Sequence, residues 1–134
     1  MSITHPESRL RLHPSERGIS AGQQLDLAAS LQLLRAEDHP AIHGHRQVTL
    51  FHQAPVTMVL FAFDAGGVLP DHVTHGLVTI RAIEGAITVE VPGGEHTLAP
   101  HQVLILDPSV PHSVRAAQAS AMLLTVHLLA PPVA

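Results

Sequence analysis

The chain of 134 residues has 46% apolar residues, no cysteine, tryptophan or tyrosine, and a formal net charge of −4. This length suits one domain with a buried core, and the missing cysteine excludes disulfides, thiolate metal sites and a cysteine nucleophile. Three phenylalanines, and 7 basic against 11 acidic residues, provide neither a stacking platform nor a basic surface for nucleic acid. No apolar run reaches the ~20 residues that cross a bilayer, and the first residues lack the apolar stretch of a secretory signal, so we expect a cytoplasmic protein that binds no membrane.

Hydrophobic periodicity and turn residues divide the chain into two parts. Residues 1–24 show no sustained period, which predicts an arm or loop, and an amphipathic pattern from Leu25 to Arg35 predicts a short helix. Farther on, turn residues separate short apolar runs, which are 48–53, 56–63, 77–83, 86–91, 103–106 and 121–129. Runs at roughly ten-residue spacing indicate about eight or nine strands in a sandwich or barrel. We therefore expect an arm and helix, 1–46, that pack on a β-barrel domain, 47–134.

The chain contains 12 histidines, and only their positions can separate compositional bias from a metal site. Histidines in the arm, in loops or beside glycine turns are expected to lie on the surface; these are His5, His13, His39, His43, His45 and His96. His52 and His127 sit in apolar strand-like sequence, where a side chain faces either the interior or solvent.

Two further stretches combine glycine and histidine at suggestive spacings. The first is GGVLPDHVTHGLVTIRAIEG, from Gly66 to Gly85, and the second is SVPHSV, which contains His112. Together they resemble the cupin superfamily, whose members carry the motifs G-x5-H-x-H-x3,4-E-x6-G and G-x5-P-x-G-x2-H-x3-N. The resemblance covers about residues 47 to 129. It implies an all-β protein, a cupin jelly-roll β-barrel of the small RmlC-like type, with a short N-terminal helix and arm.

Half of the four metal ligands typical of the family stand at matching positions. In the first motif Gly66, His72 and Gly85 match, whereas Thr74 replaces the second histidine and Val78 replaces the glutamate.

In the second motif His112 matches the last metal ligand. His101 and Ser109 replace two glycines, Pro108 lies next to the position of the family proline, and Ala116 replaces the asparagine. Histidine is among the residues that adopt left-handed backbone conformations, so a conformational role suffices for His101.

Strand parity indicates which neighbours of His72 share its face. Residues of equal parity lie on one face, so Thr74, Val78 and Ile80 point into the barrel if His72 does. His75 has the opposite parity and turns inward only through a local bulge. The interior floor is then apolar where a metal-binding cupin carries a carboxylate.

Imidazoles hold divalent transition metals such as Zn, Ni, Fe or Mn best when three or four protein ligands are available. His72 and His112 supply two, and His75, His52 or His127 supplies the third if it faces the interior. Of these we expect His75 to join the metal ligands, and Thr74, Val78, Ile80, His127 and His52 to line a ligand pocket. No P-loop or G-x-G-x-x-G motif calls for a nucleotide or flavin.

Three functions remain open at this point. The first is a metal-dependent enzyme, such as an oxygenase or isomerase, acting on a small molecule. The second is a metal-free ligand-binding or sensing module without catalysis. The third is a metal-free acid–base enzyme that pairs Asp71 or Asp107 with a histidine, although adjacent residues such as Asp71 and His72 face opposite sides of a strand. In each case we expect a homodimer, because the exposed strands of a small jelly roll need a cover.

Overall fold

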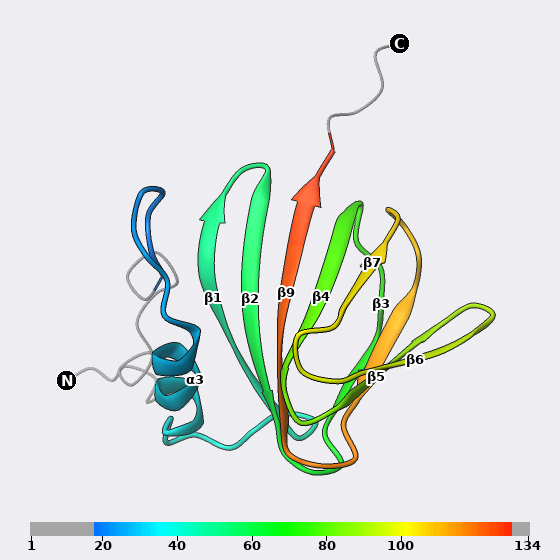
Figure 1. Ribbon diagram of the computed structural model, residues 1–134, viewed down its shortest axis with the longest axis horizontal. Coiled ribbons are helices and arrows are strands. Elements are labelled where there is room, and N and C mark those ends of the chain that lie inside the picture. The colour runs from blue at the N-terminus through cyan, green and yellow to red at the C-terminus, as the bar shows by residue number, and fades with distance from the viewer. Residues whose placement is uncertain (1–17, 130–134) are drawn as a thin grey trace, which may run out of the picture.

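The computed structural model of the chain describes residues 18–129, which form two antiparallel sheets and one helix (Figure 1). One sheet has the strand order β1-β2-β9-β4-β7 and the other has the order β3-β8-β5-β6. The strands are β1 (His45–Gln53), β2 (Val56–Phe63), β3 (Val68–His72), β4 (Gly76–Glu84), β5 (Ile87–Val91), β6 (Gly94–Leu98), β7 (Val103–Leu106), β8 (His112–Arg115) and β9 (Ser120–Leu128). The expected all-β jelly roll with a short helix is confirmed.

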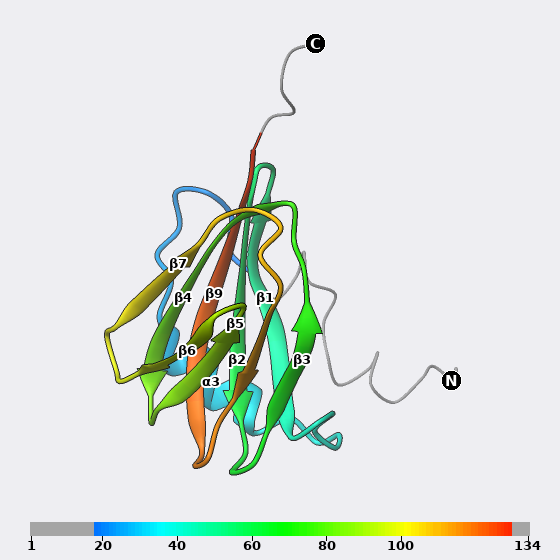
Figure 2. The same cartoon turned by 90° about the vertical axis from the view of Figure 1, so that its right-hand side faces the viewer.

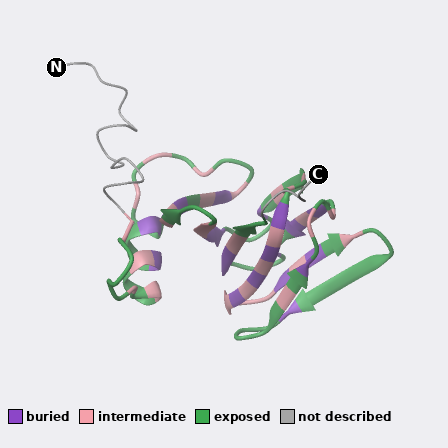
Figure 3. Cartoon of the chain, turned by 90° about the horizontal axis from the view of Figure 1, so that it is seen from above, coloured by how far each residue is buried: buried purple, intermediate pink, exposed green. Residues whose placement is uncertain are grey.

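The two sheets face each other across the main hydrophobic core, as the side view shows (Figure 2). Alternate residues of β2, β4, β5 and β9 enter this core, so buried and less buried positions alternate along these ribbons (Figure 3). The fully buried members include Phe63, Val78, Ile80, Ile87, Val89, Val114 and Met122. We call the space between the two sheets the interior of the barrel.

Helix α3 (Leu27–Arg35) covers part of the outer face of the larger sheet. Its Asp26 side chain accepts a hydrogen bond from the Ala29 amide and so caps the first turn. Leu31 and Leu34 pack against Val48, Leu50, Leu60, Ala62, Ala121 and Leu123 in a second core. Because β2 and β9 contribute to both cores, the middle of the larger sheet is buried on both faces.

The structure also shows where the observed boundaries of the elements differ from those expected from the sequence. β1 begins at His45, two residues before the expected start of the barrel domain. Three of the nine strands, β3, β6 and β8, lie outside the six apolar runs because they are short and carry polar or proline residues. The expected arm falls mostly on residues 1–17, outside the described part of the chain. No helix within residues 18–129 is long and apolar enough to cross a membrane.

Candidate functional site

His72 and His112 lie side by side at one end of the smaller sheet. β3 ends at His72, the antiparallel strand β8 begins at His112, and the two residues are direct cross-strand partners. Cross-strand partners place their side chains on the same face of a sheet. The two imidazole rings accordingly stand 4.1 Å apart between centroids, at an interplanar angle of 61°. Residues 40 positions apart in sequence thus form a pair.

Backbone carbonyls hold both rings in the same way. Nδ1 of His72 lies 3.2 Å from the Pro70 carbonyl oxygen, and Nδ1 of His112 lies 3.1 Å from the Val110 carbonyl oxygen. A carbonyl oxygen only accepts, so each Nδ1 must carry the proton that it donates. In the neutral imidazoles Nε2 is then the atom with the free lone pair. Metal-binding histidines commonly have this arrangement, with the other ring nitrogen donating to a carbonyl.

His112 is buried although its Nε2 has no hydrogen-bond partner. The residue is 1% exposed, and its Nε2 is one of three buried side-chain nitrogens in residues 18–129 that lack a partner. Burial lowers the pKa of His112 from its ordinary value; the Val110 carbonyl opposes this effect, His72 adds to it and Asp71 opposes it. The neutral ring, whose Nε2 accepts hydrogen bonds or binds a cation, is therefore favoured.

The part of the barrel interior that β4 lines is apolar. Val78 and Ile80 on β4 are 2% and 0% exposed and belong to the main core, as parity indicates. The position where many cupins carry a glutamate is therefore filled by an apolar side chain, which supplies no charge and no ligand.

Thr74 and His75 lie in the connection between β3 and β4 rather than on a continuous strand. The Thr74 hydroxyl donates to the Gly76 carbonyl over 3.3 Å, and the Thr74 carbonyl accepts from the Ser109 amide over 2.8 Å. This second bond ties the connection that follows His72 to the one that precedes His112. His75 is exposed.

His127 lies on the wrong face to serve the interior. On β9, Met122 and Leu124 enter the main core, whereas Leu123 enters the core beneath α3. His127 has the parity of Leu123 and is exposed, so it faces outward. The expectation that it lines an interior pocket is not supported by this placement.

His52 is turned toward the interior side by an irregularity in β1. The register between β1 and β2 shifts between Thr49 and Phe51, which pairs His52 with Thr57. Thr57 shares its parity with the core residue Phe61 on β2. Nδ1 of His52 lies 2.8 Å from the Thr57 hydroxyl, but His52 is exposed. Within residues 18–129, no group of three or more histidine, aspartate or glutamate side chains could hold a metal ion, so neither His52 nor His75 completes the pair.

His45 corrects a sequence-based expectation. It was expected on the surface, but it begins β1 and is 8% exposed. Its ring packs on Phe61 and Phe63, each at 5.6 Å between centroids, and its Nδ1 lies 2.9 Å from the Val68 carbonyl oxygen. Since β1 and β3 belong to different sheets, this contact joins them. The preceding loop sequence gave no signal of this burial.

Comparisons with solved structures agree with this architecture. A cupin superfamily protein from Desulfitobacterium hafniense has a TM-score of 0.66 at 18% identity, covering 81% of this chain and 93% of that chain. An RmlC-like cupin from Shewanella frigidimarina has a TM-score of 0.61 at 20% identity, covering 65% and 78%. The cupin_2 domain of an XRE family transcriptional regulator from Enterobacter cloacae has a TM-score of 0.57 at 16% identity, covering 65% and 99%. No family model and no curated protein matches the sequence. The fold is that of the cupins.

Proposed function

We propose that this cupin-fold chain binds a divalent transition metal ion, one of Zn, Ni, Fe or Mn, through Nε2 of His72 and His112, together with a small molecule. The observation that carries the proposal is the buried Nε2 of His112, which has no partner although its ring is held by a carbonyl. A buried nitrogen acceptor without a donor is costly, and a metal ion satisfies it.

The donor set fits such an ion. Imidazole nitrogens suit these metals, and two protein ligands leave the remaining coordination positions for water and for ligand atoms. A bound metal would supply Lewis-acid or redox chemistry, which is what an oxygenase or isomerase would use. The chain's own contribution is to orient both rings, because the Pro70 and Val110 carbonyls accept from Nδ1 and leave Nε2 of each ring for the ion.

Metal content of untagged protein tests this proposal. Wild-type protein, loaded with each of the four metals and desalted, should retain about one equivalent of at least one of them. The double variant His72→Ala, His112→Ala should lose it. The matched control His52→Ala, His127→Ala removes two exposed histidines and should keep it. Equal metal content in the two double variants, or no retained metal in the wild type, would contradict the proposal.

A metal-free binding or sensing module is the second candidate. It is favoured by the lack of a third ligand within residues 18–129 and by the apolar interior. In this case the His112 Nε2 accepts a hydrogen bond from the ligand itself. A small molecule that raises the melting temperature equally with and without a chelator would support this candidate over the metal site.

We further propose that the protein forms a homodimer through the β7 edge of the larger sheet. β7 is an edge strand, and its Val103 and Ile105 are 51% and 62% exposed. At the opposite edge, Leu50 on β1 accepts a hydrogen bond from the Ile19 amide, so that edge is partly covered by the chain itself. An uncovered apolar edge strand pairs readily with a second copy.

A further inference from the structure

The interior face of the larger sheet is packed at one edge and open at the other. Paired strands place one residue each in a cross-strand row, which from β7 to β1 is Leu106, Val78, Val126, Thr57 and His52. Leu106 and Val78 are buried. Val126 and Thr57 are half-buried, and His52 is exposed. Side chains therefore fill the interior beside β7 and β4, whereas solvent reaches it beside β2 and β1.

Strand β8, which carries His112, lies opposite β2. In the smaller sheet β8 lies between β3 and β5, and in the larger sheet β2 lies between β1 and β9. β3 meets β1 where the Val68 carbonyl oxygen bonds to the His45 ring, and β5 contacts β9. Because each neighbour of β8 contacts a neighbour of β2, the inward side chains of β8 and β2 face each other across the interior.

His112 and Thr57 lie within the reach of one small molecule. The Gly67 carbonyl accepts from the Ala116 amide over 3.0 Å, and the Gly67 amide donates to the Asp64 carbonyl over 2.9 Å, so the ends of β8 and β2 meet. His112 precedes Ala116 by four residues, and Thr57 precedes Asp64 by seven. An offset of three residues is about 10 Å along a strand, which a short carbon chain and its two polar ends can span.

Thr57 offers a hydrogen-bond donor on this open side. The register shift in β1 brings His52 opposite Thr57, and Nδ1 of His52 lies 2.8 Å from the Thr57 hydroxyl. When Nδ1 carries the proton, the hydroxyl accepts from it and keeps its own hydrogen for a ligand. Bulges that redirect a side chain in this way are common beside functional sites.

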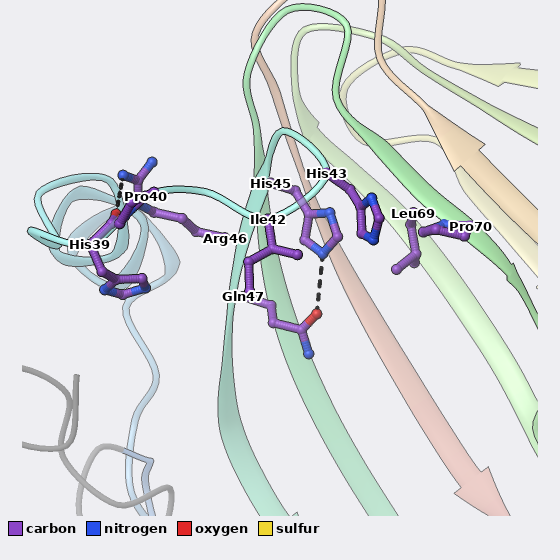
Figure 4. Close-up of a pocket in the computed structure, with 9 residues that line it drawn as sticks. All are labelled: His39, Pro40, Ile42, His43, His45, Arg46, Gln47, Leu69 and Pro70. Carbon is purple, nitrogen blue, oxygen red and sulfur yellow. Dashed lines mark hydrogen bonds between the residues drawn. The ribbon is translucent and has the colours of Figure 1, made fainter. Parts of the chain in front are cut away.

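Other inward-facing polar side chains of β1 are paired within the protein (Figure 4). Nδ1 of His45 lies 2.9 Å from the Val68 carbonyl oxygen, and its Nε2 lies 3.3 Å from Oε1 of Gln47. Thr49 has the parity of His45 and pairs with the half-buried Val59, so it adds a second inward hydroxyl. Within residues 18–129, the inward positions of this sheet carry no aspartate or glutamate that would repel an anion.

We propose that the ligand of the histidine-pair site is a short-chain dicarboxylate, with one carboxylate at the metal ion and the other at the Thr57 hydroxyl. This inference rests on the proposed function, because the ion held by His72 and His112 binds the first carboxylate. Thr57 donates a charge-assisted hydrogen bond to the second. Val59 and Val126, which pack against the main core and are half-buried, contact the carbon chain between the two carboxylates.

Isothermal titration calorimetry of protein loaded with the metal ion that it retains tests this inference. Of succinate, glutarate and adipate, at least one should bind about tenfold or more tightly than the monocarboxylate with the same number of carbon atoms, which is butyrate, pentanoate or hexanoate. Thr57→Val should remove this preference, whereas Thr57→Ser keeps the hydroxyl and should retain it. The control Thr125→Val makes the same change at a half-buried position on the outer face of β9 and should bind like the wild type. All variants should hold as much metal as the wild type.

The comparison of dicarboxylates with monocarboxylates uses the wild type, so it decides the matter even if a variant does not fold. Equal affinity for the two classes, or a preference that survives unchanged in Thr57→Val, would overturn the dicarboxylate inference alone. A wild type that retains none of the four metal ions would overturn both this inference and the proposed metal site. The two failures are therefore distinguishable.

Discussion

At the residue scale, backbone conformation at four motif positions links this chain to the cupin motifs. Gly66 and Gly85 have φ values of 83° and 70°, and His101 and Ser109, which replace family glycines, have 73° and 68°. All four are left-handed. In this chain the left-handed conformation is thus present at the two positions without glycine as well, and the conformational role expected for His101 agrees with its φ.

Ser109 offers a test of this retained turn. A left-handed conformation costs a residue with a Cβ roughly 1–2 kcal/mol, and glycine recovers part of it after its greater entropy in the unfolded chain is counted. Ser109→Gly should therefore raise the free energy of unfolding by about 0.5 to 1 kcal/mol. Ser109→Ala keeps the Cβ and should give no such gain. Urea unfolding followed by circular dichroism measures both, and a destabilised Ser109→Gly variant would contradict the strain argument.

Protonation of His112 should make the metal-free protein less stable in acid. Its native pKa lies below the ordinary 6.5, so the unfolded chain takes up this proton first as the pH falls. The contribution of the neutral His112 ring to the free energy of unfolding is fully present above about pH 6.5. It is lost as the pH falls from about 6.5 toward the native pKa. Chelator-treated wild type should lose more stability between about pH 7.5 and 5 than His112→Gln does. The variant His127→Gln should behave like the wild type, and an unchanged pH dependence in His112→Gln would exclude this role.

Strand parity and motif spacing were the two sequence features from which residues of the candidate site could be predicted. Val78 and Ile80 lie in the main core as the parity argument expects, but the register shift between Leu69 and His72 and the break in the strand before Gly76 were not foreseen. Parity and spacing could not foresee the register shift that turns His52, because a bulge changes the face of later residues without a clear sequence signal. The burial of His45 depends on a contact with the other sheet, which local sequence does not encode.

At the element scale, the larger sheet is stabilised from both sides, and α3 supplies the outer cover. The helical period of residues 25–35 predicts this helix, and the structure shows which face is buried: Leu34 is 1% exposed, whereas its neighbour Leu33 is 72% exposed. The strands that sequence patterns missed are short or polar. β6, for example, has four exposed residues of five, so hydrophobic alternation is absent.

The two adjacent leucines of α3 provide a matched test of this cover. Leu34→Ala leaves a cavity in the second core and should lower the free energy of unfolding by about 2–5 kcal/mol. Leu33→Ala deletes the same side-chain atoms at a solvent-exposed position and should change the free energy of unfolding by less than about 0.5 kcal/mol. Chemical denaturation of both variants is the measurement. Similar losses in the two variants would show that the helix does not pack as described.

At the scale of the whole molecule, the candidate metal site lies in the smaller sheet and the proposed dimer edge lies in the larger sheet. The histidine pair lies where β3 ends and β8 begins, in the smaller sheet. The uncovered β7 edge lies at the far side of the larger sheet from β1. The proposed dimer edge and the histidine pair therefore belong to different sheets.

Light scattering tests this dimer. The wild type should show twice the 14.3 kDa of one chain at micromolar concentration. Ile105→Glu places a charge in the proposed interface and should yield the monomer. Ile42→Glu changes a residue of similar exposure, 65% against 62%, outside the edge and should remain dimeric. A monomeric wild type would contradict the homodimer, and a dimeric Ile105→Glu variant would place the interface elsewhere.

The central claim is that His72 and His112 bind a metal ion through Nε2, while Nδ1 of each ring donates to a carbonyl oxygen. Long-range ¹H–¹⁵N correlation spectra of the histidine side chains, recorded before and after one equivalent of Zn²⁺, test it most directly. Before Zn²⁺, both rings should be protonated at Nδ1 and not at Nε2; afterwards, the Nε2 signals of these two histidines should shift while those of His127 and His52 stay in place. Protonation at Nε2 in the metal-free protein, or shifts confined to other histidines, would contradict the account.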